Sequence, residues 1–337
     1  MTSPAAPAAD PARRSRLLAV KLAALVRDHA GEAEVEPGVW RGGAALVRNG
    51  EAWVLAEEQP QRALGPALAW SRQQGAGHLH VLAERSTGIL ARRAALFTQP
   101  PEIWHVEGRT LLAALAEPYP PAVEVPVAMQ EMRQLIIDGG ADPVEEHGVL
   151  VGEVYGLEVC RVMIDDFTGE ARLEVGVGAH DREAFALLHG NIPTLDALAR
   201  VVGTITEHRR PGVAGHPLNR LGAERRLRAS IVANPSLVGA SWLTVAPPPV
   251  PRVSLKDPIP CVAAGLTPTG EPIVAVVSVG IDLDLVPFAA DARAALGDPA
   301  ATLVLAVPSR DVHAVTTWAA GRLSHPATVV GIDLAGG

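Results

Sequence analysis

Residues 44–56 read AALVRNGEAWVLA, two short apolar runs on either side of Asn49-Gly50. An Asn-Gly pair in this setting is a strong short-range signal for a β-hairpin with a type I′ turn. The segments that follow alternate in pattern between helix 61–73, strand 78–82, helix 87–97 and strand 103–106. Because strands separated by helices need crossover connections, the sequence predicts an α/β fold with a mixed sheet and helices on both faces.

The segments that precede the hairpin extend this pattern, with an amphipathic helix over 16–27 and strand signals over 35–40. The C-terminal part of the chain has the same order of elements: helix 223–233, strands 243–246, 261–265 and 273–279, helix 285–296, strand 302–307, helix 311–323 and strand 328–332. We therefore expect two similar αβββαβ-type cores, that is, a pseudo-repeat. The part between them has long strand signals over 149–164 and 171–177, and helices over 181–189 and 194–208.

Proline-rich stretches mark the expected domain boundaries. The sequence predicts a disordered tail (1–12), an N-terminal α/β domain (13–116), a linker (117–126), a middle α+β module (127–210), a second linker (211–219) and a C-terminal α/β domain (220–334).

The composition excludes several classes of protein. The chain has 337 residues, 48% of them hydrophobic, and a net charge of −8, so it can form a core and lacks a general basic coat. Lys21 and Lys256 are its only lysines and neither follows a glycine, which excludes a P-loop. Cys160 and Cys261 are its only cysteines, which excludes a Cys₄ zinc site and a disulfide framework. No apolar run is long enough to span a membrane, and we expect a cytoplasmic protein.

One resemblance to a known family involves residues 221–293. The run ERRLR at 224–228, the run NPSLVG at 234–239, and the hairpin and helix that follow resemble the C-terminal catalytic domain of restriction-endonuclease-like proteins, the PD-(D/E)XK superfamily. The resemblance implies a nuclease-like core that cleaves phosphodiesters with metal-binding acids and a lysine in an [DE]xK motif. Here the corresponding strand, 273–278, reads IVAVVS and the chain contains no [DE]xK. We therefore expect a catalytically degenerate, nuclease-like domain.

A nuclease-like domain that binds nucleic acid without cleaving it would use the arginines in and near the predicted helix 223–233. Leu227 and Ile231 are four residues apart and define its buried stripe, so the neighbouring arginines are expected on the outer side. Such a group could neutralise phosphates, although a solvated helix face explains it as well. The candidate nucleic-acid-binding residues are Arg209, Arg210, Arg220, Arg225, Arg226 and Arg228.

The middle module offers an alternative, a metal-dependent hydrolase or nuclease. Its acids could converge on one sheet face and hold a divalent metal, the only cofactor that we consider; otherwise we expect none. The candidate ligands are Glu158, Asp166 and Glu174, and the candidate catalytic residues are Glu174, His180 and Asp181. Exposed acids and a helix cap at Asp181 explain the same residues without a site.

His78 and His80 lie two apart in a predicted strand, so both project from one face and could share a metal. No carboxylate accompanies them at a recognisable spacing, and a structural histidine pair is the alternative.

Taken together, the sequence favours a non-catalytic, nuclease-like protein that binds nucleic acid or a protein partner. The metal-dependent hydrolase and a purely structural scaffold remain the alternatives.

Overall fold

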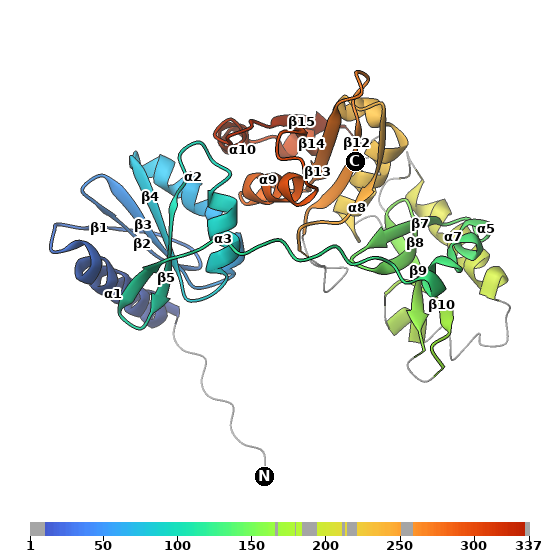
Figure 1. The fold of residues 1–337 in the computed structure, drawn as a ribbon, viewed down its shortest axis with the longest axis horizontal. Coiled ribbons are helices and arrows are strands. Elements are labelled where there is room, and N and C mark those ends of the chain that lie inside the picture. The colour runs from blue at the N-terminus through green and yellow to red at the C-terminus, as the bar shows by residue number, and fades with distance from the viewer. Residues whose placement is uncertain are drawn as a thin grey trace, which may run out of the picture. The chain divides into compact units, whose positions relative to one another are not determined.

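The computed structural model describes residues 11–165, 168–178, 180–183, 194–210, 213, 221–250 and 259–333. It confirms an α/β protein, with three mixed or antiparallel sheets and nine α-helices in the described part (Figure 1). The chain divides into two compact units. Unit 1 comprises 1–118, 283–291 and 318–326, and unit 2 comprises 119–282, 292–317 and 327–337.

Unit 1 contains a six-stranded sheet whose order follows the sequence. Its strands are β1 (Glu36–Gly38), β2 (Gly43–Arg48), β3 (Glu51–Ala56), β4 (His78–Ala83), β5 (Glu102–Glu107) and β6 (Thr110–Ala113). The pairs β3–β4 and β4–β5 are parallel and the others antiparallel. Asn49 and Gly50 have φ values of 52° and 78°, which confirms the predicted hairpin turn.

Helices cover both faces of this sheet (Figure 1). Helix α1 (Pro11–Ala30) buries Leu22, Leu25 and Val26 against side chains that include Trp53 and Leu55 of β3. Helices α2 (Leu64–Gln74) and α3 (Thr87–Ala94) pack against β4 and β5, respectively. The helix α1 begins at Pro11, and residues 1–10 of the expected tail lie outside the described residues.

Two buried arginines of α3 connect segments of unit 1 that are far apart in the sequence. Arg92 Nε donates to Asp291 Oδ1 at 2.8 Å, and Arg93 contacts Asp291 at 3.1 Å and Asp284 at 3.0 Å. The backbone N–H of Gly65 also donates to Asp284, at 3.1 Å. Residues 283–291 are therefore fixed to α3 by buried charge pairs and to α2 by a hydrogen bond from a backbone N–H.

The first sheet of unit 2 is an antiparallel meander in the order β10-β9-β8-β7. Its strands are β7 (Asp142–Glu146), β8 (Val149–Val154), β9 (Leu157–Ile164) and β10 (Ala171–Val175). The single strand expected over 149–164 is wrong, because the chain reverses at Tyr155 and Gly156, where φ is 46° and 74°. Two consecutive residues with positive φ form a type I′ turn, which joins β8 to β9.

The second sheet of unit 2 has the order β11-β12-β13-β14-β15. The strands are β11 (Trp242–Ala246), β12 (Cys261–Leu266), β13 (Pro272–Val277), β14 (Thr302–Pro308) and β15 (Thr328–Ile332). Two antiparallel pairs are followed by two parallel pairs, as in β1–β5 of unit 1. Leu227 and Ile231 of α8 (Ala223–Ala233) pack against this sheet.

The remaining helices are α4 (Val127–Gln130), α5 (Arg133–Asp138), α7 (Thr194–Arg209), α9 (Leu285–Ala295) and α10 (Ala314–Ala320). The predicted helix over 181–189 lies outside the described residues from 184 onward, as does the predicted linker 211–219 except for residue 213. No helix in the described ranges is both long enough and apolar enough to cross a membrane.

Candidate functional site

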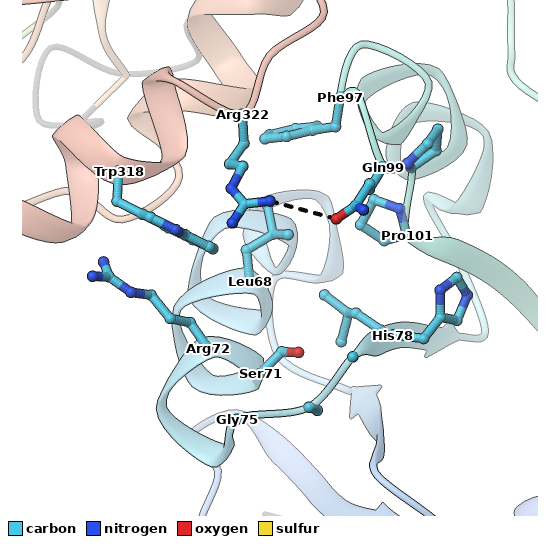
Figure 2. Close-up of a pocket in the computed structure, with 14 residues that line it drawn as sticks. Leu68, Ser71, Arg72, Gly75, His78, Phe97, Gln99, Pro101, Trp318 and Arg322 are labelled. Carbon is cyan, nitrogen blue, oxygen red and sulfur yellow. Dashed lines mark hydrogen bonds between the residues drawn. The ribbon is translucent and has the colours of Figure 1, made fainter.

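A cavity of about 380 Å³ opens in unit 1 where α2 ends and β4 begins (Figure 2). Helix α2 contributes Leu68, Ser71 and Arg72, and the turn before β4 leads to His78. The rest of the lining comes from two later segments, and its residues are Phe97, Gln99, Pro100, Pro101, Trp318 and Arg322. The cavity thus combines apolar side chains with several hydrogen-bond donors.

Two guanidinium groups lie over the indole ring of Trp318. Arg72 Cζ is 4.7 Å from the ring centroid and Arg322 Cζ is 5.6 Å from it. Arg322 also donates from Nη1 to Oε1 of Gln99 at 3.5 Å, as Figure 2 shows. No acidic side chain of the described part of the chain lines the cavity. The cavity is therefore electropositive and complements an anionic group.

Backbone hydrogen bonds hold the two later segments of the cavity together. The N–H of Thr98 donates to the carbonyl of Arg322 at 2.9 Å, and the N–H of Ser324 donates to the carbonyl of Leu96 at 2.9 Å. Phe97 and Leu323 form an isolated antiparallel β-bridge. This pairing fixes the backbone of Arg322 beside that of Gln99.

A second cluster of polar side chains lies at the first residues of β3, β4 and β5. His78 and His80 project from one face of β4, as predicted. The structure adds Glu102 of β5, whose Oε1 is 3.1 Å from His78 Nε2 and whose Oε2 is 3.4 Å from His80 Nδ1. Glu51 Oε2 lies 3.7 Å from His80 Nε2. The sequence did not identify these carboxylates, because they reach the histidines through strand pairing rather than through spacing along the chain.

The imidazole of His80 is buried in this cluster. It stacks on the Trp53 ring with a centroid distance of 3.7 Å and an interplanar angle of 8°. Trp104 donates from Nε1 to His80 Nδ1 at 3.2 Å. Burial lowers the pKa of His80 to about 4, since the opposing attraction of Glu102 is smaller.

Three of the six predicted nucleic-acid-binding arginines are buried, which corrects their expected exposure. Arg225 and Arg228 of α8 turn toward carboxylates of the neighbouring meander: Arg225 lies 3.3 Å from Glu153, and Arg228 pairs with Glu146 and Glu153. These acids come from β7 and β8, so the charge pairs join α8 to the first sheet of unit 2. Their guanidinium groups therefore face protein and not solvent.

The third buried arginine, Arg209, donates from Nη2 to the carbonyl of Tyr155 at 3.0 Å and from Nη1 to that of Leu221 at 2.8 Å. Burial, together with the charge of Arg226, lowers the pKa of Arg209 to about 10. Arg210 is exposed and Arg226 is half-buried, while Arg220 lies outside the described residues.

The candidate acids of the middle module face guanidinium groups. Glu158 accepts from Arg161 and from Arg182 at 2.9 Å each. Burial by itself raises the pKa of Glu158, but the hydrogen bond and charge of Arg161, with the charges of Arg225 and Arg182, bring it below the usual value.

The other middle-module candidates do not assemble with Glu158 into a metal cluster within the described ranges. Glu174 pairs with Arg172 at 2.9 Å. His180 is fully exposed, and Asp181 accepts from the backbone N–H of Val177 at 2.6 Å. Asp166 lies outside the described residues.

No family model, curated protein or solved structure matches this chain.

Proposed function

We propose that the chain is a non-catalytic binding protein and that its cavity in unit 1 binds an acidic segment of a protein partner. One observation carries this proposal: the cavity places Arg72 and Arg322 against Trp318, and no acidic side chain among the described residues lines it. Among the described residues that line this site, no carboxylate balances the positive charge. A carboxylate from a partner supplies the missing charge.

The chemistry of the lining suits an Asp or Glu side chain. A guanidinium group binds a carboxylate through two parallel N–H···O bonds, and an aromatic face beneath it holds the guanidinium in place. Ser71 and Gln99 add neutral polar groups at the same cavity. Leu68 and Phe97 supply apolar contacts for the methylene groups of the bound side chain.

Two observations favour a protein partner over nucleic acid. The chain carries a net charge of −8 and so lacks the general basic surface along which a long phosphate backbone is bound, whereas a single acidic side chain needs only the local charge of the cavity. Arg209, Arg225 and Arg228 are engaged by carbonyl groups and carboxylates of the chain itself. A groove that follows a nucleic-acid backbone needs several available cations in a row.

In this proposal, the C-terminal domain that resembles a nuclease has lost catalysis and is not the site of a reaction. In the hairpin formed by β12 and β13, neither strand carries an acid or a lysine. Metal-dependent cleavage of a phosphodiester requires such ligands. The alternative hydrolase would need Glu158 and Glu174 to exchange their arginine partners for a metal ion.

The test compares two probes of similar charge, hexaglutamate and hexathymidylate, in titrations followed by calorimetry on the full chain. We expect hexaglutamate to bind more tightly, and the double variant Arg72→Ala/Arg322→Ala to bind it at least tenfold more weakly, since each charge-assisted hydrogen bond contributes about 1.5–3 kcal/mol. The matched control is Arg85→Ala, which removes an exposed arginine that does not line the cavity.

Tighter binding of hexathymidylate, with the same loss in the double variant, would replace the protein partner by nucleic acid. Binding of hexaglutamate that is equally strong in the double variant would refute the cavity as the site. Circular dichroism of each variant verifies that the fold is retained.

A further inference from the structure

The cluster at the beginning of β3, β4 and β5 has the composition of a metal site. His78, His80 and Glu102 each offer one ligand atom, and these atoms lie within 4.8 Å of one another. All three side chains lie on the α1 face of the sheet: His78 and His80 share a face of β4 with Leu82, which packs with α1, and Glu102 pairs in register with His80. An ion between them would contact two imidazole nitrogens and one carboxylate oxygen.

A second observation comes from the buried imidazole itself. The side chain of His80 is 8% exposed, and its Nε2 has no hydrogen-bond partner within the described structure. A buried polar atom without a partner is costly. Nε2 points toward Glu51, whose Oε2 at 3.7 Å is slightly beyond hydrogen-bond distance. The ring is thus held with one nitrogen toward Glu102 and the other toward Glu51.

We propose that His78, His80 and Glu102 bind a Zn²⁺ ion, with Glu51 as a positioning residue. The ion would contact His78 Nε2, His80 Nδ1 and the Glu102 carboxylate, and water would complete a tetrahedral coordination. His80 would then carry its proton on Nε2 and donate it to Glu51, an arrangement that commonly orients a ligating histidine. Two nitrogen ligands and one oxygen ligand favour zinc over Mg²⁺ or Ca²⁺, which prefer oxygen ligands.

The surroundings keep the ligands in place. Trp53 stacks on the His80 ring, and the register of the two parallel strand pairs sets the positions of Glu51, His78 and Glu102. The indole N–H of Trp104, which donates to His80 Nδ1 at 3.2 Å, must turn away when the ion binds to that nitrogen. Its fluorescence therefore reports occupancy of the site.

The test is a calorimetric titration of ZnCl₂ into the full, untagged chain after treatment with a chelator. We expect one ion per chain, an accompanying change in tryptophan fluorescence, and a visible absorption band of four-coordinate cobalt when CoCl₂ is used instead. His78→Ala/Glu102→Gln, in which both substituted side chains are partly exposed, should weaken zinc binding at least a hundredfold. Glu51→Gln should weaken it about 10–100-fold, the range for loss of a residue that orients a ligand.

The matched control is His105→Ala, which removes a histidine from the opposite face of β5. The chain contains 11 histidines, so adventitious zinc binding elsewhere must be separated from this site. One-to-one binding that survives in His78→Ala/Glu102→Gln, or no zinc binding by the wild-type chain, would overturn the proposal. His78 also lines the cavity, but the cavity variants at Arg72 and Arg322 leave all three zinc ligands unchanged, so either proposal can fail alone.

Discussion

Arg228 has a guanidinium group that is 1% exposed and pairs with Glu146 and Glu153. Removing one partner of a buried ion pair costs up to about 3–5 kcal/mol; without Arg228, Glu146 and Glu153 would keep their longer contacts to Arg225, at 3.6 Å and 3.3 Å. We expect Arg228→Ala to lower the free energy of unfolding by up to this cost, as measured by urea denaturation. Arg226→Ala on the same helix is the control; Arg226 is half-buried, and we expect a loss below about 1 kcal/mol. Equal losses in the two variants would contradict this assignment.

The same helix shows what a single sequence can tell about individual residues. The spacing of Leu227 and Ile231 correctly predicts the apolar stripe of α8. It does not predict that Arg225 and Arg228 are also buried, because their carboxylate partners lie on β7 and β8. Sequence periodicity reports which residues prefer an apolar contact, whereas the burial of a charge depends on a partner that the periodicity does not contain.

At the scale of elements, two turn glycines have nearly the same backbone and different surroundings. Gly50 has φ +78° and open space around an added Cβ, whereas Gly156 has φ +74° and an added Cβ would lie 2.3 Å from the Arg225 backbone. A left-handed conformation costs an alanine about 1–2 kcal/mol in both turns, and a steric clash adds about 1–3 kcal/mol. We expect Gly156→Ala to destabilise the chain by at least about 1 kcal/mol more than Gly50→Ala in urea denaturation. Equal effects would show that the backbone of α8 shifts freely.

These turns also explain which strands could be predicted. Asn49-Gly50 is a recognised hairpin signal, and the strands on both sides of it occur as expected. Tyr155-Gly156 and His147-Gly148 adopt a similar pair of positive φ values, but neither is one of the Asn-Gly, Asp-Gly or Gly-Gly pairs that signal a type I′ turn in a sequence. Strands β8 and β9 were therefore predicted as one strand, and β7 was not predicted. In these two turns, the glycine was the only residue of the pair that could have indicated a reversal of the chain.

At the scale of the whole molecule, the candidate sites depend on contacts between segments far apart in the chain. Arg72 and Trp318 meet only because residues 318–326 pack within unit 1. More of the histidine cluster could be predicted, since His78 and His80 are two residues apart, the spacing that places side chains on one face of a strand. Its carboxylates depend on the register of parallel strands, which a crossover connection of variable length does not fix. The order of helices and strands along the chain was therefore more accessible from the sequence than the composition of either site.

Unit 1 is not a continuous stretch of chain, and this has a measurable consequence. A fragment of residues 1–118 keeps the whole sheet β1–β6 but loses Asp284 and Asp291, the buried partners of Arg92 and Arg93. It also exposes apolar surface that 283–291 and 318–326 cover. We expect amide hydrogens of β3 and β4 to exchange at least tenfold faster in the fragment than in the intact chain. Asp291→Asn in the intact chain should shift exchange in the same direction by less, since it removes one charge and keeps the apolar contacts. Equal protection in the fragment and the intact chain would mean that residues 1–118 fold without the later segments, and that the buried arginines find other partners.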